Sequence, residues 1–165
     1  MKVNDILKIK GEALFTAAPQ TSLRDAVATM AQHDIGSLVI MENGAYVGIL
    51  TFRETLAVVN ANNGSCGQAT IASAVRKNAP SCAPEDDISA LRELMIGSHA
   101  RYLPVLKDGS LLGVLSFYDV AKAVLEEQHF ENKMLKSYIN DWPQEGAPSE
   151  SVIKAPSQKS EKELA

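Results

Sequence analysis

The stretch GSLLGVLSFYDV, at positions 109–120, is the most informative part of this chain, because nearly the same string, GAYVGILTFRET, stands at positions 44–55. Each string runs Gly, three residues, Gly, two aliphatic residues, a hydroxyl residue, Phe, one further residue and a carboxylate. When the sequence is aligned with itself so that these two strings coincide, residues 16–60 align with residues 81–125 without a gap. A repeat of this length indicates an internal duplication of one supersecondary unit.

The composition is that of an ordinary globular protein. The chain has 165 residues, of which 45% are hydrophobic and 22% are charged, and its formal net charge is −4. This length allows a substantial core, either in one domain or in two small ones. Lys and Arg are scattered with no basic run, so the charge pattern of a nucleic-acid-binding protein is missing.

The N-terminal segment MKVNDILKIKGEAL contains Lys8 and Lys10 within its apolar part, which argues against a signal peptide. No stretch of the chain approaches the roughly 18 apolar residues of a membrane-spanning helix. We therefore expect a cytoplasmic protein without a membrane partner.

The sequence offers little for metal chemistry. Cys66 and Cys82 lack CxxC spacing, and we interpret them as free thiols in preference to a disulfide or a metal pair. The acidic run at positions 85–87 could hold a divalent cation, but in the first turn of a predicted helix it is more simply complementary to the helix dipole. The histidines show no metal-ligand spacing, so no metal site is expected. They are His33, His99 and His129.

Each copy of the repeat predicts a helix, a strand, a tight turn, a strand and a second helix. Pro19 and Pro84 open the first helices. The strands SLVIM and YVGIL flank the turn ENG in the first copy, and YLPVL and LLGVL flank KDG in the second. A short extended piece precedes each first helix, around 15–16 and 79–81. The apolar stripes of the first helices comprise Leu23, Val27 and Met30, and Ile88, Leu91, Leu94 and Met95.

The fold class that follows is α+β, with five segments along the chain. The first repeat spans residues 1–62, a polar linker spans 63–70, and the second repeat spans 71–127. A helical extension covers 128–142, because its sequence contains no Gly or Pro and has a partial apolar stripe. The tail at 143–165 is expected to be disordered, since it is rich in proline and poor in large apolar side chains.

The repeated TFRE and SFYD motifs have two interpretations. Each fits a capping box, in which the hydroxyl residue caps a helix and the carboxylate three residues later reaches back to it. Each also fits a ligand site, because a strand that leads into a helix points backbone N–H groups at the crevice between them. Gly48 and Gly113 would let another backbone or a ligand approach closely. Ser116 could then bind a phosphate, and Asp119 two ribose hydroxyls.

These residues carry a family resemblance. The repeated G-h-h-[ST]-x-x-D pattern, with IGSLVI in the first copy and RYLPV in the second, resembles a tandem pair of cystathionine-β-synthase (CBS) domains of the stand-alone bacterial type, over roughly residues 3–127. The resemblance implies two pseudo-two-fold-related α+β units. It further implies a regulatory module that binds AMP, ADP, ATP or S-adenosylmethionine between the copies and forms a homodimer.

Carried over position by position, the resemblance implies two nucleotide sites, one for each copy. Ser116 would contact phosphate, Asp119 the ribose, and Arg101 would reach the phosphate. Glu54 departs from the family's Asp, and we interpret the first site as degenerate. The preferred second site comprises Ser81, Arg101, Leu103, Pro104, Val105, Ser116 and Asp119. The first-site equivalents are Thr16, Leu38, Val39, Thr51, Arg53 and Glu54.

The expected function is regulatory and not enzymatic. The sequence has no G-x-S-x-G, H-E-x-x-H or P-loop motif, and no nucleophile with an identifiable base. We expect an adenine-nucleotide sensor that signals through a homodimer or through a protein partner bound by the C-terminal helix. One alternative is a structural or scaffolding pair whose cleft has lost its ligand. A weaker alternative is a nucleic-acid-binding accessory protein, against which the acidic charge balance speaks.

Overall fold

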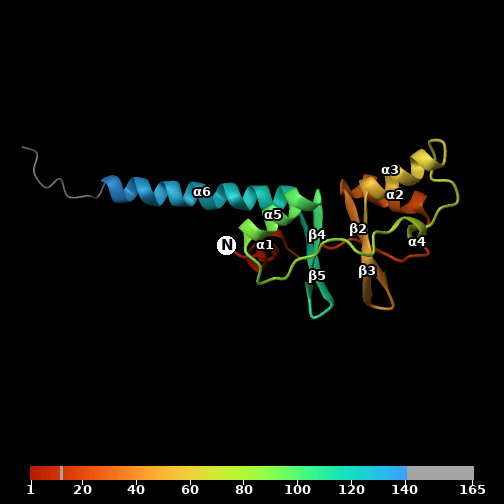
Figure 1. Ribbon diagram of the computed structural model, residues 1–165, viewed down its shortest axis with the longest axis horizontal. Helices are drawn as coiled ribbons and strands as arrows, with labels where there is room; N and C mark the ends of the chain where they lie inside the picture. The colour runs from red at the N-terminus through yellow and green to blue at the C-terminus, as the bar shows by residue number, and fades with distance from the viewer. Residues whose placement is uncertain (12, 141–165) are drawn as a thin grey trace, which may run out of the picture. The chain divides into compact units, whose positions relative to one another are not determined.

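The computed structural model describes residues 1–11 and 13–140, and Figure 1 shows the arrangement of its helices and strands. The expected tail at 143–165, together with the last two residues of the expected helical extension, lies outside the described residues. The elements in chain order are α1 (Val3–Lys10), β1 (Thr16–Ala17), α2 (Leu23–His33), β2 (Ser37–Glu42), β3 (Ala45–Thr51), α3 (Phe52–Ala61), α4 (Ile71–Ala74), α5 (Ile88–Ser98), β4 (Tyr102–Lys107), β5 (Ser110–Ser116) and α6 (Phe117–Asn140).

The duplication is visible in the two hairpins. β2 pairs with β3 and β4 with β5, both antiparallel, and each pair has a register shift at the equivalent point. Asn43 and Gly44, like Asp108 and Gly109, have positive φ at the two turns. Asn-Gly and Asp-Gly tolerate this backbone, whose twist matches that of the flanking strands. The predicted helix–strand–turn–strand–helix unit and the α+β class are therefore confirmed.

The predicted short extended pieces differ between the copies. β1 adds to β2 as a parallel strand. In the second copy only Cys82 forms a bridge, to Val105, and its N–H donates to the carbonyl of Pro104 at 3.1 Å. Pro104 itself lies inside β4, a strand of a two-stranded sheet, where its missing N–H is tolerated.

The acidic run at 85–87 lies before α5 and not in its first turn, so its predicted position is wrong, and only Asp87, the N-cap, directly adjoins the helix. Asp86 accepts a hydrogen bond from the Ala83 N–H at 2.8 Å, and Asp87 is the residue before the first helical one. Glu85 pairs with Lys107 at 3.2 Å. The carboxylates thus close a local turn and form surface ion pairs before the helix begins.

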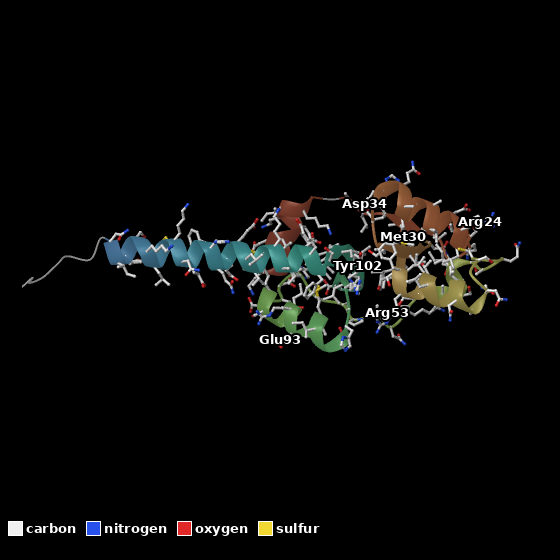
Figure 2. The ribbon with its side chains drawn as sticks, turned by 90° about the horizontal axis from the view of Figure 1, so that it is seen from above. Arg24, Met30, Asp34, Arg53, Glu93 and Tyr102 are labelled. Carbon is white, nitrogen blue, oxygen red and sulfur yellow. The ribbon has the colours of Figure 1, made fainter. Side chains whose placement is uncertain are left out.

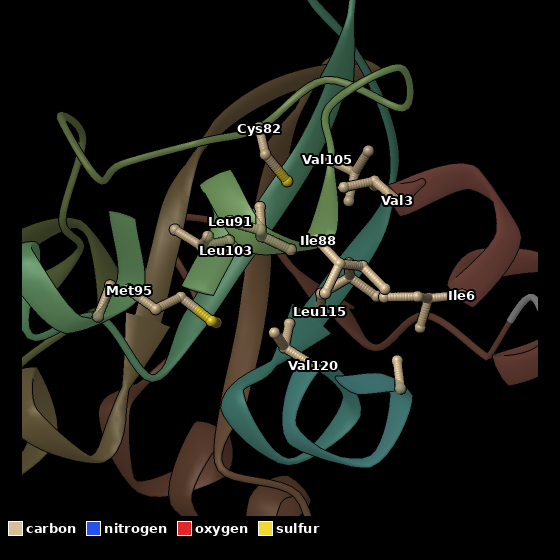
Figure 3. Close-up of a cluster of buried hydrophobic side chains, with 12 residues drawn as sticks. Val3, Ile6, Cys82, Ile88, Leu91, Met95, Leu103, Val105, Leu115 and Val120 are labelled. Carbon is tan, nitrogen blue, oxygen red and sulfur yellow. The ribbon is translucent and has the colours of Figure 1, made fainter. Parts of the chain in front are cut away.

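The two leading helices, α1 before the first copy and α4 before the second, are exchanged between the copies. Val3 and Ile6 of α1 are buried in the core of the second copy, where Val3 lies beside Val105 and Ile6 beside Ile88 (Figure 3). Ile71 of α4 is buried in the core of the first copy. Figure 1 likewise places α1 near α5 and the β4–β5 hairpin. Each hydrophobic core is therefore completed by a helix that belongs to the other half of the chain.

Gly48 and Gly113 are the points at which the exchanged segments meet the hairpins. A Cβ at Gly48 would stand 2.6 Å from the backbone oxygen of Arg76, and one at Gly113 would stand 2.9 Å from Cδ2 of Leu7. Next to Gly48, Ile49 and Arg76 exchange backbone hydrogen bonds of 3.2 and 3.0 Å. The predicted close approach of another backbone is confirmed at Gly48, whereas the neighbour at Gly113 is a side chain, that of Leu7.

The described chain forms one compact unit over Met1–Phe130, and α6 continues from it into a second unit that begins at Glu131. The helical extension predicted after the second repeat is thus one continuous helix with the last helix of that repeat as far as Asn140. None of the helices in residues 1–11 and 13–140 is both long enough and apolar enough to cross a membrane.

Candidate functional site

The two copies line an open cavity of about 1130 Å³, which we call the larger cavity. Its walls come from both halves of the chain: residues 13–15 and 34–37 from the first, and 99–102 and 116–118 from the second. Lys10, Val39, Arg53, Met95, Ile96 and Val114 complete the lining. A concave, mostly apolar space with a few converging polar groups is the usual form of a small-molecule site.

Ser116 stands at this cavity, at the junction of β5 and α6, and forms a capping arrangement with Asp119. The backbone N–H and the hydroxyl of Ser116 both donate to Asp119 Oδ2 at 2.7 Å, and the Asp119 N–H donates back to the Ser116 oxygen at 3.1 Å. The capping-box interpretation of the SFYD motif is therefore confirmed, and it places a hydroxyl and a carboxylate beside the cavity.

Lys10 is one of the residues of this site that the sequence motifs did not indicate. Its ammonium donates to Asp119 Oδ2 at 2.7 Å and to the carbonyl of Val114 at 2.9 Å. Lys10 is the last residue of α1, which the exchange brings to the second copy. The apolar spacing of Val3, Ile6 and Leu7, followed by two lysines, could have predicted this amphipathic helix.

These hydrogen-bond donors stabilise the ionised form of the Asp119 carboxyl. Burial of the carboxyl acts to raise its pKa, but the hydrogen bonds from Lys10 and Ser116 outweigh burial, so the pKa lies below the ordinary value of 3.8. All three donors meet one oxygen, Oδ2, while Oδ1 has no hydrogen-bond partner among the described residues. A carboxylate in this state can accept one more donor at Oδ1.

The charged groups that line the larger cavity are mostly cationic. Lys10, Arg53 and Arg101 face a single carboxylate, that of Asp34. Arg53 also donates to the backbone oxygen of His99 at 2.7 Å, which ties the start of α3 to the second copy. Figure 2 shows Arg53 and Tyr102 where the two copies meet. Four aromatic side chains complete this part of the lining: Phe15, Tyr102, Phe117 and Tyr118.

A second cavity of about 260 Å³, the smaller cavity, lies at the equivalent junction of β3 and α3. Thr51 and Glu54 line it and repeat the capping arrangement, in which the Thr51 N–H donates to Glu54 Oε2 at 2.9 Å and the Thr51 hydroxyl donates to the same oxygen. Arg53, Arg76 and Arg101 also line this cavity.

Each cavity is lined by residues from both copies of the repeat. The larger cavity joins Ser116 of the second copy to Phe15 of the first, and the smaller joins Thr51 of the first copy to Pro80 of the second. Ser81 and Thr16, the hydroxyl residues that the sequence placed at these sites, are not among the residues that line either cavity. Their neighbours line the cavities instead. Phe15 lies in the larger cavity with Ser116 of the second copy, and Pro80 lies in the smaller cavity with Thr51 of the first copy.

The apolar residues expected at the sites divide between core and cavity. Leu38, Leu103 and Val105 are fully buried in the two cores, and Pro104 is also buried. Val39 lines the larger cavity. Arg101 and Ser116, from the expected second site, meet there, while Asp119 reaches this cavity through its bonds to Ser116 and Lys10. Arg53 and Glu54 meet Thr51 in the smaller one.

No group of three or more His, Cys, Asp or Glu side chains that could hold a metal ion occurs in the described part of the chain. His33 lies against Phe15, with ring centroids 4.5 Å apart. Cys82 is buried, whereas Cys66 is partly exposed.

The two repeat units correspond to a known family. The family model described as "CBS domain" matches residues 4–61 and 71–126. The chain belongs to the CBS domain family. The mitochondrial CBS domain-containing protein CBSX3 of Arabidopsis thaliana is 28% identical to it over 146 residues, which cover 83% of this chain and 71% of that protein.

Solved CBS structures share the fold of this CBS pair. The CBS-domain-containing protein ATU1752 of Agrobacterium tumefaciens is 34% identical, with a TM-score of 0.70 over 74% of this chain and 98% of that one. A protein with CBS domains from Burkholderia ambifaria is 27% identical, with a TM-score of 0.72 over 78% of this chain and 96% of that one. The recognition of a tandem CBS pair from its repeated motif is thereby confirmed.

Proposed function

We propose that this CBS pair is a non-catalytic regulatory module that binds an adenine nucleotide in the larger cavity. The observation that carries the proposal is the convergence of Ser116, the Lys10–Asp119 pair and Arg101 around one large cavity between the copies. A hydroxyl and two cations suit a phosphate, and a charged carboxylate with a free oxygen suits a ribose hydroxyl.

The charge of the lining favours AMP, ADP or ATP over S-adenosylmethionine. Lys10, Arg53 and Arg101 outnumber the carboxylates of Asp34 and Asp119 by one, so an anionic phosphate gains attraction where a sulfonium cation meets repulsion. The aromatic side chains offer faces on which an adenine ring can stack, of which Tyr118 is 74% exposed. An AMP molecule therefore matches the lining better than a cationic nucleoside does.

Related folds support this class of ligand. The solved structure of CBSX2 is a complex with AMP; it is 19% identical to this chain and has a TM-score of 0.62. The CBS pair of MJ0100 was solved with 5′-methylthioadenosine and S-adenosyl-L-methionine; it is 22% identical, with a TM-score of 0.66. Both likenesses concern the fold, so the identity of the ligand here rests on the residues of this chain.

Regulation would follow from the position of the larger cavity between the copies. A ligand that contacts both copies favours the arrangement to which it binds more tightly, and it shifts the population by that difference in affinity. We propose a homodimer or a protein partner as the receiver of this shift. Exposed apolar side chains on α3 and α5 could serve such a contact: Phe52, Leu56 and Ile96.

A scaffolding function is the second candidate, and the Lys10–Asp119 pair favours it. The ammonium of Lys10 already neutralises the carboxylate that a ribose would meet. In a ligand-free scaffold this pair would be a permanent part of the fold. In a sensor a ribose hydroxyl would donate to the free Oδ1 of Asp119, while Lys10 keeps Oδ2.

Calorimetric titration of the ligand-stripped protein with AMP, ADP, ATP and S-adenosylmethionine separates these functions. Asp119→Ala should weaken nucleotide affinity at least about tenfold, because a charge-assisted hydrogen bond is lost. Asp25→Ala, which removes an exposed carboxylate of α2 outside both cavities, is the matched control. A ligand at 100 times its Kd should also raise Tm by roughly 5–10 °C. Absence of binding by all four ligands would leave the scaffolding function as the better account.

A further inference from the structure

The last part of α6 is a helix whose side chains are all exposed. Every residue from 128 to 140 is exposed, and α6 continues through them without a break. They include large apolar side chains that are 43–73% exposed: Phe130, Met134, Leu135, Tyr138 and Ile139. An isolated helix of this length is only marginally stable in water, and most helices of proteins are stabilised by packing of an apolar face. This part of α6 therefore offers a surface that a partner can cover.

The spacing of residues along α6 defines a heptad pattern on one side of the helix. Positions 125, 128, 132, 135 and 139 are separated alternately by three and four residues, and all of them are exposed. Leu125, Asn132 and Ile139 would occupy the a positions of a coiled coil, and Gln128 and Leu135 the d positions. Because a and d positions form one line along a helix, we call this line the α6 seam.

We propose that the α6 seam binds the same seam of a second copy of this chain, as a parallel two-stranded coiled coil. The identities of the seam residues favour this arrangement. A β-branched residue at an a position with Leu at a d position, as in Ile139 and Leu135, favours two strands over three or four. A single Asn at an a position, here Asn132, specifies the register and the number of strands, since the two amides can hydrogen-bond to each other.

The charges beside the seam determine the orientation of the two helices. Glu131 and Lys136 occupy a g and an e position, and both are exposed and form no ion pair with the described residues. In a parallel pair each g position faces the e position five residues further along the other strand, so Glu131 of each copy meets Lys136 of the other. In an antiparallel pair g faces g and e faces e, and Glu131 would not meet Lys136. The charges are therefore complementary in the parallel pair.

Two exposed apolar residues of α6 lie outside the seam and provide a comparison. Phe130 and Met134 correspond to f and c positions, on another side of the helix. Met134 and Leu135 are neighbours, and they are 43% and 59% exposed. The proposed pairing thus predicts different effects for two adjacent side chains of similar size. It does not rest on nucleotide binding, so either proposal can fail without the other.

Disulfide cross-linking of the full chain tests the pairing position by position. In a Cys66→Ser background, Asn132→Cys and Ile139→Cys each place a thiol at an a position, where equivalent residues of parallel strands face each other. Ser137→Cys places an equally exposed thiol at an f position, away from the partner. Under mild oxidation the two a-position variants should form cross-linked dimers at least about tenfold faster than the f-position variant, because a disulfide requires close Cα atoms. Cys82 is buried and stays in place.

Further substitutions in the Ile139→Cys protein test which side chains hold the pair. Leu135→Ala should slow cross-linking at least about fivefold through the loss of apolar contacts, whereas Met134→Ala should change the rate less than about twofold. Glu131→Lys should slow it at least about threefold, because attraction becomes repulsion at both symmetric contacts. Addition of Lys136→Glu should restore the rate. Circular dichroism establishes that each variant is folded.

The results decide between the parallel pair and its alternatives. Fast cross-linking at positions 132 and 139 but not at 137, with recovery in the double charge variant, supports the parallel pair. Equal rates at the three positions, or equal effects of Leu135→Ala and Met134→Ala, would overturn it. So would sedimentation of the unaltered protein as a monomer at every concentration. Calorimetry with AMP, ADP and ATP is a separate readout: specific cross-linking without nucleotide binding would keep the coiled coil and refute the proposed nucleotide function.

Discussion

Lys10 and Asp119 lie 109 residues apart in the chain, and their side chains meet in a hydrogen-bonded ion pair of 2.7 Å. The pair joins the last residue of α1 to the first turn of α6, beside the larger cavity. It thus connects three features of this CBS pair: the exchanged leading helix, the capped SFYD motif and the candidate ligand site. Each of these features can be tested by substitution.

Lys10→Met should lower the free energy of unfolding at pH 7 by about 0.5–1 kcal/mol, since the pair is partly exposed and the aliphatic stem is kept. The pKa of Asp119 is depressed in the folded state, so its stabilisation is present at pH values above the ordinary 3.8 and is lost as pH falls through the folded value. Urea unfolding from pH 7 to pH 2.5 should therefore show the difference between variant and parent shrinking in acid. Lys8→Met, on the same helix and with no ion pair among the described residues, should show no such pH dependence.

Gly36→Ala should destabilise the protein by about 1–3 kcal/mol, because the added methyl group would overlap Tyr102 and Phe52. A Cβ there would stand 2.6 Å from Cζ of Tyr102, and closer still to its hydroxyl oxygen. Gly97→Ala is the matched control: Gly97 lies in α5 with no atom within 4 Å of its would-be Cβ, so the change should be neutral or stabilising by up to about 1 kcal/mol. Equal effects of the two changes on Tm would contradict the close contact at Gly36.

The two equivalent glycines of the hairpins should differ in tolerance. Gly48→Ala should cost about 2 kcal/mol or more, because the methyl group meets the backbone oxygen of Arg76, which is fixed by its bridge to Ile49. Gly113→Ala meets only the end of the Leu7 side chain, which can rotate, and should cost less than about 1 kcal/mol. Thermal unfolding of both variants measures which change destabilises the protein more. A larger loss of stability in Gly113→Ala than in Gly48→Ala would contradict the contacts described for the exchanged segments.

Alkylation should distinguish the two cysteines in the native state. Burial, with a smaller effect of the Asp86 carboxylate, raises the pKa of Cys82 to about 12, so its reactive thiolate is scarce at pH 8. Cys66 is partly exposed and should be labelled by iodoacetamide at least about tenfold faster. Mass spectrometry of digested samples follows both rates, and equal rates should appear only in denaturant. Fast native labelling of Cys82 would mean that its core opens readily.

Much of the repeat unit could be predicted from short-range patterns. The Asn43-Gly44 and Asp108-Gly109 turns form where they were expected, because only a few residues tolerate positive φ. The cap at Ser116 also forms as expected, since its partner Asp119 stands three residues along the same helix. The predicted position of the acidic run at 85–87 in the first turn of a helix was wrong, because a local turn competes with the helix for the same residues.

The duplicated α+β unit, its turns and its caps could be predicted from the sequence, because all of these depend on residues close together along the chain. Which core α1 and α4 each complete depends on long-range packing, and with it the contact of Lys10 with Asp119 and the shared cavity of Arg53, Arg76 and Arg101. The apolar stripe of α1 shows that this helix must be buried. It does not choose between two cores built from the same repeat, and that choice is made by the packing of side chains distant in sequence.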